Sequence, residues 1–366
     1  MAQAALTSFG AASTSISVVD TESPHRLSPD ASSNPLLANL SKREIPSLSG
    51  LRGVAALTVV LYHYLEGTKL SGSIPGTYAV TLFFELSGLL ITWLLLQEIE
   101  VRGQLDWKHF YCRRALRLFP VFYVVWIMCR LARPFPGSVA TFFYMGDYYT
   151  ALTGHYSILT SAWSLGVEEK FYLLWPVLLV RIGRPQLIKV LFGVLLFEPV
   201  YRSILVLSGF RTYTWFAFDT HLDAIVLGCL IALLAKQGWR PPQWLFHRAT
   251  PLIALGLMLA LQNQSDIVTY LLAVILVSVI CQPAAVLNCA VTRYFGKISY
   301  SLYLCHAYTT NVIWPRLSIP VIHHFSLPLS LILQLAIAIS VASVLHFAIE
   351  RPFLRIKNAL KTGQNA

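Results

Sequence analysis

Long apolar segments recur from residue 48 to residue 349, and they constrain the fold of this chain more than any other feature. They cover roughly residues 48–66, 77–97, 118–133, 163–182, 187–207, 219–236, 250–263, 267–287, 298–316 and 327–349. A helix needs about 20 apolar residues to cross the hydrocarbon core of a bilayer. Only 12% of the residues are charged, against about 25% in soluble domains. The sequence therefore predicts an all-α, polytopic integral membrane bundle with about ten transmembrane helices, since the third and seventh segments are short.

The basic residues give the chain a formal net charge of +11, but they are spread between the apolar segments. This spacing argues against nucleic acid as a partner and indicates that the partner is the lipid bilayer. Lys and Arg gather in alternate connections between the segments, and few of them lie in the other connections. The positive-inside rule then predicts a multi-pass protein with both termini in the cytoplasm.

The two ends of the chain differ in composition from the part between them. Residues 1–44 are rich in Ala, Ser and Pro and lack the apolar region of a conventional signal peptide, so we expect a disordered cytoplasmic tail. Residues 45–355 form the predicted transmembrane domain, and residues 356–366 form a short cytoplasmic C-terminal tail. The six cysteines are scattered, which favours small buried side chains over disulfides or metal ligands.

The first apolar segment contains an arginine near its start, Arg52, and a histidine near its end, His63. In a helix, a separation of 11 residues places both side chains on one face, about 16 Å apart along the axis. Polar groups on one stripe of a membrane helix are costly in lipid, which favours a functional cleft. The alternative is an arginine that anchors the helix at the interface and a histidine that makes a hydrogen bond within the bundle.

Three arginines, Arg113, Arg114 and Arg117, lie in the connection of residues 98–118. One interpretation is a basic helix at the membrane interface, with neighbouring aromatic residues as apolar anchors. The other is a site for a phosphorylated ligand at the cytoplasmic mouth, because clustered guanidinium groups suit phosphates.

Residues 163–172 place two carboxylates, a lysine and a tyrosine at the start of another apolar segment. Glu168 and Tyr172 share a helical face, and Glu169 points about 100° away from it. We expect one carboxylate to pair with Lys170 or solvent and the other to face the bundle. A meeting of Glu168 with His63 is geometrically allowed, and a carboxylate beside an imidazole is a general-base arrangement.

Further polar residues lie inside the apolar segments, and we take five residues as candidates for binding a substrate: Tyr172, Asp223, Ser299, Tyr303 and His306. We expect Asp223 and His306 to face the same bundle interior, because lone charges facing lipid are disfavoured. The alternative for Ser and Tyr is interhelical hydrogen bonding. His323 and His324 lack acidic or Cys companions and make a poor metal site, so no metal is predicted. The sequence also lacks the motifs of serine hydrolases, P-loop ATPases and zincins.

Six motifs, in order over residues 45–355, resemble the membrane-bound acyltransferase 3 family. They are Leu51-Arg52-Gly53 with His63, residues 82–91, residues 110–120, residues 163–172, Leu222-Asp223-Ala224 with Gly228, and residues 296–306. In the family pattern, Glu85 stands where an aliphatic residue is usual and Lys170 where a glutamine is usual. Many bacterial members add an extracytoplasmic hydrolase-like domain. Only a short segment follows the last apolar segment here, so we expect the given chain to be the membrane module alone.

The resemblance implies an O-acyltransferase that moves an acyl group, acetyl in the first instance, from acyl-CoA to a hydroxyl of a carbohydrate or another small molecule. It implies that His63 is catalytic with Arg52 as its partner, that Glu168 is the acidic residue, and that Arg113, Arg114 and Arg117 bind the donor. Acyl-CoA is then a co-substrate, and no cofactor is bound permanently. His63 acts either as a general base on the acceptor or as the group that first accepts the acyl chain.

Two other classes compete with the enzyme. A proton-coupled carrier would use the same intramembrane His, Glu and Asp residues, but it predicts inverted repeats that the two halves of the sequence do not show. A membrane scaffold without catalysis leaves four residues unexplained: Arg52, His63, Glu168 and Asp223.

Overall fold

The structure is a computed structural model that describes residues 34–42, 44–261, 264–318 and 326–362. In these ranges all regular secondary structure is helical, which confirms the all-α prediction. Each apolar segment of the sequence falls largely on a helix. The predicted tail over residues 1–33 and the His323–His324 pair lie outside the described residues.

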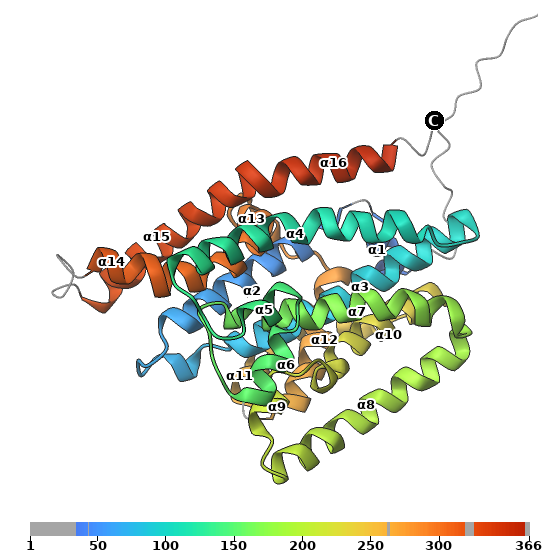
Figure 1. Cartoon of the computed structure of the whole chain (residues 1–366). Coiled ribbons are helices and arrows are strands. Elements are labelled where there is room, and N and C mark those ends of the chain that lie inside the picture. Colours follow the sequence, from blue (N-terminus) through green and yellow to red (C-terminus); the bar gives the residue numbers. More distant parts are fainter. Residues whose placement is uncertain (1–33, 43, 262–263, 319–325, 363–366) are drawn as a thin grey trace, which may run out of the picture.

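The helices follow one another along the chain with short connections (Figure 1). The first eight are α1 (Pro35–Leu40), α2 (Pro46–Tyr64), α3 (Gly76–Arg102), α4 (Trp107–Ala132), α5 (Ser138–Phe142), α6 (Gly146–Thr153), α7 (Trp163–Arg181) and α8 (Arg184–Leu207). The others are α9 (Arg211–Phe216), α10 (Leu222–Lys236), α11 (Thr250–Ala260), α12 (Ser265–Cys281), α13 (Ala290–Tyr308), α14 (Trp314–Ser318), α15 (Leu327–Leu345) and α16 (Arg351–Thr362). Two π-helical turns, Thr309–Ile313 and His346–Glu350, continue α13 and α15 into the helices that follow them.

Four helices of the described chain are long and apolar enough to cross a membrane: α3, α4, α8 and the continuous run Leu327–Lys357. In the most apolar window of α3, 72% of the residues are buried inside the protein, against 17% in α8. Figure 1 shows α8 along one side of the bundle and the continuous α15–α16 run along another. Leu196, Phe197 and Leu207 of α8 are largely exposed, as expected of side chains that face lipid.

Glycines bring two pairs of helices into close contact. A Cβ atom added at Gly88 of α3 would lie 2.0 Å from the carbonyl oxygen of Ile225 in α10. A Cβ atom added at Gly53 of α2 would lie 2.6 Å from the backbone nitrogen of Gly296 in α13. Small residues allow such approach between membrane helices. The contacts hold α2 against α13 and α3 against α10, and they fix the faces that carry the polar residues.

The structure adds three details to the predicted organisation of the chain. Residues 35–40 form α1, whose Leu36 and Leu40 are buried, so the folded part begins before residue 45. The C-terminal segment predicted as a short tail is helical through Thr362. The arginines of residues 113–117 belong to the spanning helix α4 and not to a separate interfacial helix. Helix α4 starts this early because Asp106 caps it, with its side chain accepting a hydrogen bond from the His109 N–H at 3.0 Å.

Candidate active site

The candidate site is a polar cluster that α2, α3, α4 and α7 contribute to jointly. Its central carboxylate is Glu168 of α7, which accepts a hydrogen bond from the Ser87 hydroxyl of α3. The same Ser87 oxygen lies 3.0 Å from the hydroxyl of Tyr172, one turn further along α7. The predicted shared face of Glu168 and Tyr172 is therefore present, and it points into the bundle.

Three arginines lie near this carboxylate. Arg52, Arg114 and Arg117 lie within electrostatic reach of Glu168. The Arg114 guanidinium also lies 5.3 Å from the ring centroid of Tyr172. None of the three makes an ion pair within 4 Å in the part of the chain that the structure describes, and all are partly buried. Their donors are therefore available to an anionic ligand.

Arg113 does not belong to this group. Its guanidinium nitrogen Nη2 lies 2.9 Å from Oε2 of Glu98 in α3, which satisfies its charge on another face of α4. The three arginines predicted to bind the donor therefore lie on two faces of α4. Arg114 and Arg117 face the cluster, and Arg113 faces α3. Arg52, predicted as the partner of His63, joins the first two.

His63 lies at the opposite end of α2 from Arg52, about 16 Å further along the axis because the helix is continuous between them. Its side chain is 38% exposed, so a substrate can reach it. The nearest carboxylate is that of Glu66, 3.7 Å from Nδ1. The ring stacks on His306 of α13 with 5.1 Å between centroids. The predicted meeting with Glu168 is not present, because Glu168 is bound to Ser87.

His306 and Tyr303 are buried on α13 beside this histidine. Nδ1 of His306 donates to the Tyr303 carbonyl oxygen, and its Nε2 is buried with no hydrogen-bond partner among the described residues. The Tyr303 hydroxyl lies 2.7 Å from the Ser164 hydroxyl and donates to the Ser161 carbonyl at 2.8 Å. Tyr303 thus ties α13 to the start of α7, which is the structural role expected of a tyrosine on a membrane helix.

Two other predicted substrate residues have local partners. Asp223 accepts a hydrogen bond from Arg202 of α8 at 2.6 Å, and the same guanidinium also pairs with Asp266 of α12. Arg202 therefore links α8 with α10 and α12, and Asp223 does not meet His306. The Ser299 hydroxyl donates to the Gly296 carbonyl oxygen of its own helix at 2.9 Å.

Lys170 pairs with neither of the neighbouring glutamates. Its ammonium group lies 2.8 and 2.9 Å from the two carboxylate oxygens of Asp147 in α6. Burial raises the pKa of Asp147, and the hydrogen bonds from Lys170 act in the opposite direction. Glu169 is partly buried, and its Oε1 has no hydrogen-bond partner among the described residues. Both carboxyl oxygens of Glu85 are buried and also lack a partner there.

Two residues in or beside the cluster were not identified from the sequence. One is Ser87, a serine in a motif of apolar residues, which carries the hydrogen bond to Glu168. The other is Glu350, whose carboxylate accepts from Ser301 at 2.7 Å and pairs with His346 at 2.9 Å. Glu350 also acts electrostatically on Arg52. Its signal was an acidic residue at the end of the last apolar segment, next to an arginine.

The arrangement combines an anion-binding group of three unpaired guanidiniums with an accessible imidazole on the same helix as one of them. No group of three or more His, Cys, Asp and Glu side chains in the described ranges could hold a metal ion. Guanidinium groups can bind an anion such as a phosphate, and an accessible imidazole can take up a proton.

Comparison with known proteins gives matches over most of the chain. A family model described as "Acyltransferase domain" matches residues 45–348. The peptidoglycan O-acetyltransferase OatA of Listeria monocytogenes is 28% identical over 332 residues, which cover 76% of this chain and 51% of that protein. A Bacillus subtilis protein named "Putative peptidoglycan O-acetyltransferase YrhL" is 29% identical over 357 residues, which cover 85% of this chain and 55% of that protein. This chain thus spans about half the length of these relatives. No solved structure matches.

Proposed function

The chain belongs to the acyltransferase family whose model it matches over residues 45–348, and from this premise we propose that it is a membrane O-acetyltransferase. The family assigns it to the enzymes that transfer acyl groups other than aminoacyl groups. The donor in the proposal is acyl-CoA, in the first instance acetyl-CoA. The acceptor is a hydroxyl of a carbohydrate, a class supported by the relatives named for O-acetylation of peptidoglycan.

The observation that carries the proposal is the group of unpaired guanidiniums of Arg52, Arg114 and Arg117. Acyl-CoA carries phosphates at one end and a thioester at the other, joined by an arm of about 15–20 Å when extended. The separation of about 16 Å between Arg52 and His63 along α2 matches that arm. Phosphates bound at the arginines would bring the thioester to the accessible imidazole.

The proposal includes the membrane topology. The proposed topology has about ten transmembrane helices, of which four are long and apolar enough in the described residues to cross a membrane by themselves. Both termini lie in the cytoplasm in this topology, a placement supported by the distribution of Lys and Arg. The start of α4 and the end of α3 then face the cytoplasm, where acyl-CoA is present. His63 lies toward the opposite side, where an exported acceptor would enter.

In the proposed reaction, His63 takes the proton of the acceptor hydroxyl while the oxygen attacks the acyl carbon of the thioester. The carbon–oxygen bond forms, the carbon–sulfur bond breaks, and the proton passes from the imidazolium to the CoA thiolate. In the alternative route, His63 first accepts the acyl group and then passes it to the acceptor. A labelled acyl group that stays on the protein when the acceptor is omitted would identify the second route.

The test is reconstitution of the purified chain in lipid nanodiscs with radiolabelled acetyl-CoA and a panel of carbohydrate acceptors. We expect release of free CoA thiol and a labelled, base-labile ester on the acceptor. No ester and no thiol release with any acceptor, from protein that is folded, would refute the proposal.

A further inference from the structure

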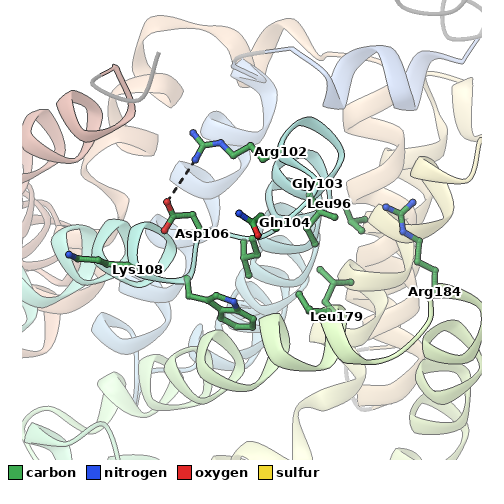
Figure 2. A pocket seen from close by; sticks show the side chains of 12 residues that line it. Leu96, Arg102, Gly103, Gln104, Asp106, Lys108, Leu179 and Arg184 are labelled. Carbon is green, nitrogen blue, oxygen red and sulfur yellow. Dashed lines mark ion pairs between the residues drawn. The ribbon is translucent and has the colours of Figure 1, made fainter. Parts of the chain in front are cut away.

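A second feature of the molecule is a cavity of about 720 Å³ at the connection between α3 and α4. Its wall comes from the end of α3, the connecting turn, the start of α4, the end of α7 and the first residue of α8. Figure 2 shows Leu179 and Arg184 on one side of the cavity and Lys108 on the other, with Gln104 between them. A volume of this size is that of a pocket for a small organic ligand.

The turn that forms the floor is held in place by its own contacts. Gly103 ends α3 with a φ of +73°, a conformation that favours glycine. Asp106 pairs with Arg102 at 3.9 Å, and its backbone N–H donates to Glu98 at 3.2 Å. Hydrogen bonds from His109 hold the pKa of Asp106 below its ordinary value, which keeps it a carboxylate at neutral pH. The shape of the cavity therefore exists without a ligand.

The charged side chains that line the cavity are mostly cationic. They are Arg102, Lys108 and Arg184, with Asp106 as the one lining carboxylate. Arg184 also contacts Glu100 at 3.5 Å, but that carboxylate is shared with Lys236. An anionic ligand fits this excess of positive charge.

The cavity also has an aromatic and apolar side. Trp107 lines it and is 39% exposed, and its ring stacks on Tyr111 with 6.4 Å between centroids. Leu96 and Leu179 complete this side. A ligand that combines a flat ring system with phosphate groups matches both sides of the lining.

The cavity and the candidate site lie along the same face of α4. Trp107 and Arg114 are seven residues apart, which returns to within about 20° of the same direction and separates them by about 10 Å. The intervening Tyr111 donates a hydrogen bond to the Leu173 carbonyl of α7 at 3.2 Å, and Arg114 lies over Tyr172 of the same helix. Side chains of α4 and α7 thus connect the two places.

We infer that this cavity holds the nucleoside end of the acyl-CoA donor, with the base beside Trp107 and the 3′-phosphate between Lys108 on one side of the cavity and Arg184 on the other (Figure 2). The inference rests on the proposed function. Two parts of the donor then have separate sites: the diphosphate lies at Arg114 and Arg117, and the adenosine lies about 10 Å away, at the start of α4. The arm then runs along α2 toward His63.

The inference is tested with the full chain in nanodiscs and two donors, acetyl-CoA and acetyl-pantetheine, which lacks the nucleotide. In the double variant Lys108→Gln/Arg184→Gln, we expect the KM for acetyl-CoA and the Kd for CoA to rise about tenfold or more. The KM for acetyl-pantetheine should stay within about twofold, because that donor makes no contact with the cavity. Trp107→Ala should act in the same direction, and Trp107→Phe should restore most of the affinity because it keeps an aromatic ring.

Lys189→Gln is the matched control, since Lys189 is exposed on α8 outside the cavity lining and should bind CoA as the unchanged protein does. Adenosine 3′,5′-bisphosphate should compete with CoA in the unchanged protein and lose this ability in the double variant. If the double variant binds CoA as tightly as the unchanged protein, the cavity is not the nucleoside site while the proposed donor stands. If the unchanged protein binds no CoA at all, the proposed donor fails, and this inference fails with it.

Discussion

The imidazole of His63 stacks on that of His306, with 5.1 Å between the ring centroids and an angle of 25° between the planes. His306 is buried, and its Nδ1–H is committed to the Tyr303 carbonyl, so its ring is fixed in one orientation. His63 is the more exposed of the two and is the one that a substrate can reach. His306 of α13 thus positions the ring of His63 by stacking on it. The carboxylate of Glu168 interacts with the arginines instead.

This division leads to a prediction for Glu168. Glu168→Gln keeps the hydrogen bond with Ser87 but removes the charge between the three arginines. We expect kcat/KM for the donor to fall about tenfold, because the guanidiniums lose the group that positions them. The acid limb of the pH–rate profile should stay in place, whereas Glu66→Gln should move it, since Glu66 is the carboxylate near His63. A displaced acid limb in Glu168→Gln would show that Glu168 acts on the imidazole after all.

The effect of substituting an arginine of α4 should depend on the helical face that carries it. Arg114→Ala and Arg117→Ala should each raise the KM for acetyl-CoA by about 10–100-fold, because each removes a charge-assisted contact to phosphate. Arg→Lys at these positions should restore only part of the affinity, since lysine lacks the bidentate fork. Arg113→Ala is the matched control, because Glu98 already holds that guanidinium, and its KM should change by less than a few-fold. Equal effects at all three positions would argue for an anchor helix without a ligand.

The pair of Lys170 and Asp147 should matter for folding. Asp147 is fully buried, so Lys170→Met leaves an unpaired carboxylate and should cost about 3–5 kcal/mol of stability. The double variant Lys170→Met/Asp147→Asn should recover most of this loss. Because burial raises the pKa of Asp147 in the folded state, stability falls as the pH rises from the unfolded-state value toward the folded-state value. The single variant should therefore be closer to the unchanged protein at about pH 5 than at about pH 7, as thermal unfolding in detergent can measure.

The close contact between α3 and α10 can be tested with one methyl group. Gly88→Ala places a Cβ atom 2.0 Å from the Ile225 carbonyl oxygen, so the helices must move apart, at a cost of about 1–3 kcal/mol. Gly193→Ala on α8 is the matched control, because nothing lies within 4 Å of the added atom. Thermal unfolding should show a lower midpoint for the first variant only. Equal midpoints for the two variants would mean that α3 and α10 do not pack this closely.

The helices could be predicted from the sequence because burial in lipid requires apolar residues in runs of helical length. The 16 Å separation of Arg52 and His63 followed from the helical repeat in the same way. The early start of α4 was missed because the three arginines interrupt the apolar pattern. That pattern reports contact with lipid and does not report a polar face that points into the bundle.

The partners of the charged side chains could not be predicted, because they depend on how far each helix is rotated and shifted against its neighbours. Lys170 stands beside two glutamates in the sequence, yet it binds Asp147, which lies 23 residues earlier. Asp223 binds Arg202, which lies on another helix 21 residues earlier. For the same reason, the contact between Glu168 and His63 that the sequence allowed is not present. Two residues in the same half of the membrane need not touch each other.

The proposed chemistry depends most directly on His63. We expect His63→Gln to lower turnover by about 10²–10⁴-fold, because glutamine keeps a hydrogen-bonding side chain but cannot act as a base. Binding of CoA and the thermal unfolding midpoint should stay near those of the unchanged protein, since the side chain is partly exposed and makes no short hydrogen bond among the described residues. His155→Gln, at an exposed histidine in the connection before α7, is the matched control and should keep full activity. If folded His63→Gln protein still transfers acetyl groups within a few-fold of the normal rate, another group removes the proton. The buried Nε2 of His306 would then be the nearest candidate, because it is the other ring of the stacked pair and has no hydrogen-bond partner among the described residues.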